Sequence, residues 1–183
     1  NHIGYILVGL TINTFNGVQA AIIYLFIYVI TNLIFFYIIT NINNSGNFIY
    51  INYWSDLIKL YRFDTGKFLL MSLTLLSMAG VPPLMGFWGK YFILVATMSA
   101  KFYILTYITI FISTISNFYY IAILLTSWNK LSVLQVLTYF YWKTNPYYFW
   151  VYLLFLTMQL LIFCNLDLFF DCFAKITYSC KYI

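Results

Sequence analysis

The sequence has very little charge. Only 7% of its 183 residues are Asp, Glu, Lys or Arg, and glutamate is absent altogether. Soluble domains carry about 25% charged residues, so this chain could not cover a surface that faces water. Because hydrophobic residues make up 64% of the sequence, we interpret it as a polytopic membrane protein and exclude a soluble enzyme or binding domain.

Residues that hold cofactors are also scarce. His2 is the single histidine, whereas a haem held by two histidines needs a second one. Cys164, Cys172 and Cys180 form no C-x-x-C pair, and Fe–S clusters require clustered cysteines. No glycine loop of the nucleotide-binding type is present, and the nine basic residues are scattered rather than gathered into a patch. We therefore expect no cofactor, no metal and no nucleic acid partner, while quinone binding stays open.

The hydrophobic runs predict an all-α protein with about six membrane helices, since one span needs about 20 apolar residues. The first run is too short to cross a bilayer alone, and we expect it to continue from, or abut, another polypeptide. Asn13, Asn16 and Gly17 predict the turn that follows it. A polar stretch at 41–67 contains a predicted interfacial helix at 53–61, and residues 171–183 form a polar tail. The predicted membrane helices cover residues 3–13, 18–40, 68–81, 84–100, 102–128 and 147–170.

One apolar stretch contains both helix breakers and a charge: MAGVPPLMGFWGKYFIL, residues 78–94. Pro82 and Pro83 remove backbone donors, and Gly86 and Gly89 loosen a helix. We expect a helix interrupted at membrane depth, close to residues 84–90, where the freed backbone lines a cavity or is buried in protein. The alternative is that the two prolines end one span in a water-exposed turn and begin the next.

Lys90 is the only basic residue well inside an apolar span. Ionisable groups at membrane depth usually mark an ion or proton path. Because burial disfavours the charged form of a lysine, such a group can gain and lose a proton in response to a nearby charge. The alternative is a lysine whose side chain extends to the headgroups at the membrane surface.

Three segments together resemble a known family. The stretch around Lys90 resembles the A-G-x-P-x-x-x-G-F-x-x-K signature of the antiporter-like subunits of respiratory complex I. NHIGYILVGL, residues 1–10, resembles the S-S-x-x-H-x-G-Y-x-L segment of the subunit 2 branch of that family. STISNFYYIAILL, residues 113–125, resembles a downstream segment of the same branch that carries two adjacent tyrosines. The resemblance extends from His2 to about residue 128.

The resemblance implies a fold and roles for particular residues. Family members have two inverted five-helix repeats, each with one broken helix. This chain resembles the second repeat, at residues 1–128, followed at 129–183 by a connector, a terminal membrane helix and a polar tail. Lys90 would be the lysine of the second broken helix, toward the proton exit, and His2 and Tyr5 would face the central hydrophilic axis. For His2, a purely structural role at a helix interface stays open.

The implied function is that of a non-redox membrane-arm subunit of proton-pumping NADH:ubiquinone oxidoreductase. A subunit of a multi-subunit cation/proton antiporter and a structural subunit without pumping are the alternatives. Expected partners are lipids and the other complex I membrane subunits, including a chain that supplies the N-terminal half of subunit 2, unless this chain is truncated. Its many Phe, Tyr, Ile, Asn and Lys residues use codons rich in A and T. This suggests an organelle genome, and hence the mitochondrial inner membrane, with the bacterial plasma membrane as alternative.

Overall fold

The computed structural model describes residues 1–42, 65–82, 84–128, 150, 153–155, 157 and 166–180. Within these residues every regular element is a helix and no strand is present. The interfacial helix predicted at 53–61, Pro83 and most of the span predicted at 147–170 lie outside the described residues. The helices are α1 (His2–Thr11), α2 (Phe15–Ile42), α4 (Thr65–Ala79), α5 (Met85–Ser99), α6 (Tyr103–Trp128) and α9 (Leu166–Cys180).

Two of the described helices are long and apolar enough to cross a membrane. They are Phe15–Thr40 within α2 and Tyr103–Leu125 within α6, with 26 and 23 residues, against about 20 needed for a span. Helices α1, α4 and α5 are shorter, at 10, 15 and 15 residues. The all-α fold is therefore confirmed, and the number of six membrane helices stays a prediction.

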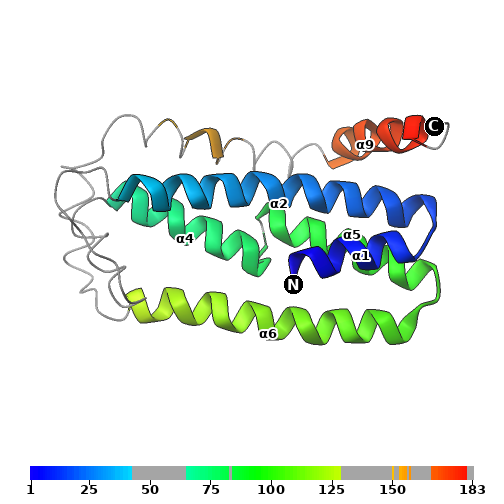
Figure 1. Ribbon diagram of the computed structural model, residues 1–183, viewed down its shortest axis with the longest axis horizontal. Coiled ribbons are helices and arrows are strands. Elements are labelled where there is room, and N and C mark those ends of the chain that lie inside the picture. Colours follow the sequence, from blue (N-terminus) through cyan, green and yellow to red (C-terminus); the bar gives the residue numbers. More distant parts are fainter. Residues whose placement is uncertain are drawn as a thin grey trace.

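Helices α4 and α5 together run beside α2. Figure 1 shows them end to end along this long helix, with α6 on their other side, and both α4 and α5 pack against α2 and α6. The residues on either side of their connection share a small cavity with Ile27 and Thr31, which lie near the middle of the 28-residue α2. The connection therefore lies at mid-depth in the bundle rather than at either end.

Glycines allow α1 and α2 to approach closely. A Cβ atom on Gly17 would lie 2.8 Å from the carbonyl oxygen of Gly9, and one on Gly9 would lie 2.9 Å from the Cβ of Ala21. Small residues at such crossings bring helix backbones together in membrane proteins. The turn between α1 and α2 is shorter than the predicted one. Asn13 lies in it with a φ of 49°, and α2 begins at Phe15. Gly17 therefore serves packing rather than the turn.

The segment predicted as a polar tail is helical as far as Cys180. Phe173 and Thr177, four residues apart, are buried, whereas Asp171 and Lys175 are exposed. This is the spacing of an amphipathic helix that packs one face against protein, here against α2. The Gln19 side chain also donates a hydrogen bond to the carbonyl of Phe170 at 3.0 Å. The charged residues of this segment led to its prediction as a polar tail, whereas the residues between them form the buried face of a helix.

Candidate functional site

The end of α4 is closed by a glycine in the left-handed conformation. Gly80 has φ 85, and its N–H donates to the carbonyl of Ser77 at 3.0 Å, while the N–H of Val81 donates to that of Leu76 at 3.2 Å. These two bonds are the pattern by which a glycine commonly terminates a helix. They satisfy two of the carbonyls that a helix end leaves free, but not the carbonyl of Ala79.

One backbone N–H at the start of α5 finds its hydrogen-bond acceptor at the end of α4. The hydroxyl oxygen of Ser77 accepts a hydrogen bond from the backbone N–H of Gly86 at 3.3 Å. Gly86 can approach so closely because it lacks a side chain: a Cβ atom there would overlap the backbone carbonyl of Ser77. Helix termini buried in apolar surroundings need such partners, and the end of α4 supplies one to the start of α5.

The position of the break corrects the sequence prediction. Helix α4 ends at Ala79 and α5 begins at Met85, so the interruption lies between these two residues, with Pro82 inside it, rather than at residues 84–90. Gly86 and Gly89 lie within α5 and do not break it. Their physical role is close approach, since a Cβ atom on Gly89 would lie 2.7 Å from the ring of Tyr24.

Lys90 points from α5 into the space that this break creates. It is only 7% exposed, and its Nζ donates to the carbonyl of Ala79 at 2.8 Å and to Oδ1 of Asn117 at 2.9 Å. The first acceptor is the carbonyl left free at the end of α4, and the second comes from α6. The lysine therefore connects both halves of the broken helix to the neighbouring helix α6.

Two neighbours shape the space around the lysine. A Cβ atom on Gly80 would lie 3.1 Å from Cδ and 3.2 Å from Nζ of Lys90, so the glycine leaves room for the side chain beside the backbone. The ring of Tyr5 has its centroid 5.9 Å from Nζ, within the range of a cation–π interaction. Tyr5 is buried, and its hydroxyl donates to the carbonyl of Thr109 at 3.3 Å. Tyr5 thus lies next to Lys90.

His2 lies close by, held by tyrosines of two helices. Its Nδ1 lies 2.8 Å from the hydroxyl of Tyr24 in α2, and its Nε2 lies 3.0 Å from that of Tyr120 in α6. Its ring stacks on Tyr28 with centroids 5.0 Å apart. His2 and Lys90 line the same small cavity. The structure therefore brings together three of the residues predicted from sequence, namely Lys90, His2 and Tyr5.

Several contributors to this site were missed in the sequence. Asn117 is a lone amide within an apolar span, a signal that could have singled it out. Gly80, directly after a helix and two residues before a proline, has the position of a helix-terminating glycine. Tyr24 carried no such signal, because the sequence has 19 tyrosines, whereas Tyr120 belongs to the tyrosine pair of the third motif, which gave it no role.

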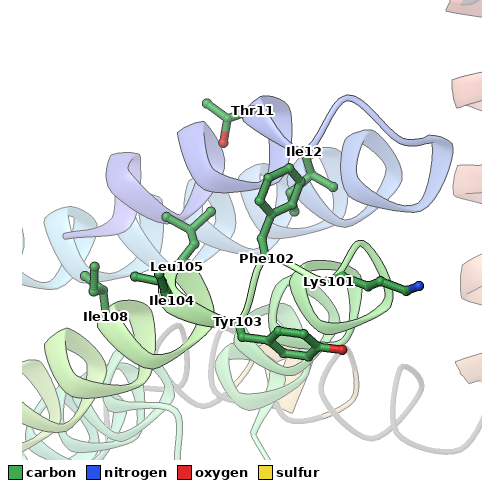
Figure 2. A pocket seen from close by; sticks show the side chains of 8 residues that line it. All are labelled: Thr11, Ile12, Lys101, Phe102, Tyr103, Ile104, Leu105 and Ile108. Atoms are coloured by element: carbon green, nitrogen blue, oxygen red, sulfur yellow. The ribbon is translucent and has the colours of Figure 1, made fainter.

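The larger pockets have a different character. One of about 540 Å³ lies where α1 ends and α6 begins. Figure 2 shows apolar side chains of both segments around it, with the ammonium end of Lys101 pointing away from Leu105 and Ile108. Another of about 530 Å³ lies along α2 between Leu33 and Thr40. Neither is lined by an acid, a histidine or a cysteine, and in the described part of the chain no cluster of metal ligands occurs.

The fold and the site define a class of protein: an all-helical membrane protein in which a broken helix presents a buried lysine at mid-depth. Residues 1–116 match the family described as NADH:quinone oxidoreductase/Mrp antiporter, transmembrane. Since this match covers more than half of the chain, the protein belongs to that family. The family membership inferred from the three sequence motifs is confirmed.

Three curated relatives are named as subunits or chains of NADH oxidoreductases. The chain is 34% identical over 122 residues to NADH-quinone oxidoreductase subunit N of Paramagnetospirillum magneticum, covering 67% of this chain and 25% of the relative. It is 33% identical over 122 residues to NADH-ubiquinone oxidoreductase chain 2 of Metridium senile, covering 67% and 30%. For the chain 2 protein of Marchantia polymorpha, identity is 36% over 120 residues, covering 66% and 24%. The chain thus spans about a quarter to a third of the length of these relatives.

Proposed function

We propose that this chain is part of a subunit-2-type membrane subunit of proton-translocating NADH:quinone oxidoreductase, in which Lys90 gains and releases a proton. The observation that carries the proposal is the burial of Lys90 at a helix break, where both of its hydrogen-bond acceptors are neutral. Residues 1–128 would form the second antiporter-like repeat. His2 and Tyr5 would belong to the same proton path. We assign no redox centre to the chain.

The neutrality of the acceptors matters for proton exchange. A buried carboxylate partner would hold the proton on the lysine, because removing one charge from a buried ion pair is strongly unfavourable. The carbonyl of Ala79 and the amide of Asn117 accept from an ammonium and from an amine alike. A neutral amine keeps two N–H groups, so Lys90 can release its third proton without losing either hydrogen bond.

A charge on a neighbouring subunit could drive this exchange. A like charge about 10 Å away, at an effective dielectric constant of about 20, raises the free energy of the protonated lysine by roughly 1.7 kcal/mol. Such a change lowers the ratio of protonated to neutral lysine by more than about tenfold. Such a charge changes the protonation of Lys90 without a movement of helices and without a redox reaction on this chain.

The expected partners of this chain follow from the names of its relatives. The chain 2 and subunit N proteins are parts of oxidoreductases by their names, so we expect the other complex I membrane subunits and lipids as neighbours. The N-terminal half of the subunit, on this or another polypeptide, would face α1, where Ile3, Leu7 and Leu10 are exposed. We place the protein in the mitochondrial inner membrane, with the bacterial plasma membrane as alternative.

A subunit of a cation/proton antiporter is the second candidate, because the family description includes the Mrp antiporters. The three relatives described above favour the oxidoreductase. Purification from native membranes decides between them: flavin and iron–sulfur subunits that accompany the chain support the oxidoreductase, and their absence from an intact assembly supports the antiporter.

The test of the proton-carrying role is the proton-to-electron ratio of the assembled complex in sealed vesicles. We expect Lys90→Met to lower this ratio while assembly is largely retained. Lys90→Arg should lower it as well, because arginine keeps its proton. Lys101→Met is the matched control, since it removes an exposed lysine from the connection between α5 and α6. A normal ratio and rate for Lys90→Met would make Lys90 a structural residue.

A further inference from the structure

Both ring nitrogens of His2 are engaged by phenols, Nδ1 with Tyr24 at 2.8 Å and Nε2 with Tyr120 at 3.0 Å. A neutral imidazole has one N–H and one lone pair, whereas a phenol can donate and accept at the same time. The phenol that accepts from His2 therefore decides which ring nitrogen keeps its proton. The arrangement also leaves His2 no nitrogen for a direct bond to Lys90, whose Nζ is bonded to Ala79 and Asn117.

A small cavity connects these groups instead. It is lined by His2, Tyr24 and Lys90 and offers about 10 Å³ to a water molecule, close to the minimum for one ordered water. Such a water needs two to four polar partners. Further polar residues that line the cavity are Tyr28, Thr31 and Ser77, so the site has the polarity that a single bound water requires.

We propose that Tyr24 relays a proton between Lys90 and His2 through one water in this cavity, and that Tyr120 is a positioning residue that fixes the tautomer of His2. This inference rests on the proposed function of Lys90 as a proton carrier. It adds roles for two residues: Tyr24 of α2, which lies outside the three motifs, and Tyr120 of α6, which the third motif contains without giving it a role.

The proton transfer balances with these groups alone. The Lys90 ammonium gives a proton to the water, the water gives one of its protons to the oxygen of Tyr24, and the phenolic proton of Tyr24 moves to Nδ1 of His2. Lys90 becomes a neutral amine and His2 an imidazolium, while the water and Tyr24 end unchanged. Tyr120 supports the step because its oxygen accepts from Nε2–H, which leaves the lone pair on Nδ1. The reverse steps return the proton.

Tyr24 is suited to this role by its burial. It is only 3% exposed, so bulk water cannot replace its hydroxyl. Its ring also packs against Tyr5, with centroids 5.3 Å apart, and this packing would be kept by phenylalanine. Tyr24→Phe therefore removes the relay oxygen while it retains the shape of the side chain.

The experiment measures proton pumping by the assembled complex with Tyr24→Phe, Tyr120→Phe and Tyr107→Phe. Tyr107 is the control: it lies on α6, as Tyr120 does, but it is 73% exposed and lies outside the relay. We expect Tyr24→Phe to slow pumping by about tenfold or more, as for loss of a positioned proton-transfer group. Tyr120→Phe should slow it less and enlarge its solvent deuterium isotope effect. Tyr107→Phe should leave the rate unchanged.

The outcomes separate this inference from the proposed function. Normal pumping by Tyr24→Phe, with Lys90→Met impaired, overturns the relay and leaves the role of Lys90 intact. Normal pumping by both removes the proposed function as well. If Tyr24→Phe lowers pumping only in proportion to a loss of assembled complex, its role is structural and the relay is wrong. An unchanged isotope effect in Tyr120→Phe overturns the positioning role.

Discussion

Replacing Gly86 by alanine tests how tightly α4 and α5 meet at the helix break. The added Cβ would overlap the backbone carbonyl of Ser77 and lie 2.7 Å from its carbon. Because the obstacle is backbone rather than a flexible side chain, no change of rotamer relieves it, and the two half-helices must separate. The hydrogen bond from Gly86 to the Ser77 hydroxyl, already 3.3 Å long, would then break.

The size of the effect follows from three contributions. Overpacking at a close contact costs about 1–3 kcal/mol, and loss of one hydrogen bond costs about 0.5–1.5 kcal/mol. Alanine in place of glycine inside a helix returns about 1 kcal/mol. We therefore expect Gly86→Ala to destabilise the folded chain by roughly 0.5–3.5 kcal/mol, the sum of these contributions.

Gly4→Ala is the control, because a Cβ atom on Gly4 meets nothing within 4 Å. The same chemical change should stabilise α1 by about 0.5–1 kcal/mol. The assay is thermal unfolding of the purified complex in detergent, where 1 kcal/mol corresponds to about 2–4 °C for a chain of this size. If the two variants unfold at the same temperature, the close approach of α4 and α5 described above is wrong.

Two further substitutions test contacts with α6. Asn117→Ala removes one acceptor from the buried amino group of Lys90, and we expect a loss of about 1–3 kcal/mol in unfolding experiments together with slower proton pumping. Thr106→Val removes the buried hydroxyl that donates to Thr97 at 2.8 Å but keeps the shape of the side chain. It should cost about 1 kcal/mol and leave pumping unchanged; a pumping defect would place α6 hydroxyls on the proton path.

The existence of the break could be predicted from the sequence, but not its position. Two prolines and several glycines in an apolar stretch are sufficient to predict an interruption. Because glycine is a poor helix former, Gly86 and Gly89 are predicted to break the helix. In the structure, the absence of their side chains instead allows close approach of neighbouring groups. What ends α4 is the left-handed conformation of Gly80. Sequence alone cannot tell a glycine that turns the chain from one that lets another helix come near.

The partners of Lys90 were beyond the reach of sequence reasoning for a different reason. Its acceptors lie 11 and 27 residues away, and the tyrosines that hold His2 lie 22 and 118 residues away. Periodicity identifies which helices form, whereas these contacts depend on how helices rotate against one another. The family motifs gave roles to Lys90, His2 and Tyr5, and the packing then gave roles to Asn117, Tyr24 and Tyr120.

The helix break and the buried lysine stabilise one another. A helix end buried in a membrane leaves carbonyls without donors, and each costs several kcal/mol; a lysine at the same depth costs about 2.5–3.5 kcal/mol on insertion scales. The bond from Lys90 Nζ to the carbonyl of Ala79, at 2.8 Å, reduces both penalties at once. The end of a helix also carries partial negative charge, which favours a cation without fixing a proton on it as a carboxylate would. A helix break can therefore stabilise a buried lysine in its charged form and still let it release its proton.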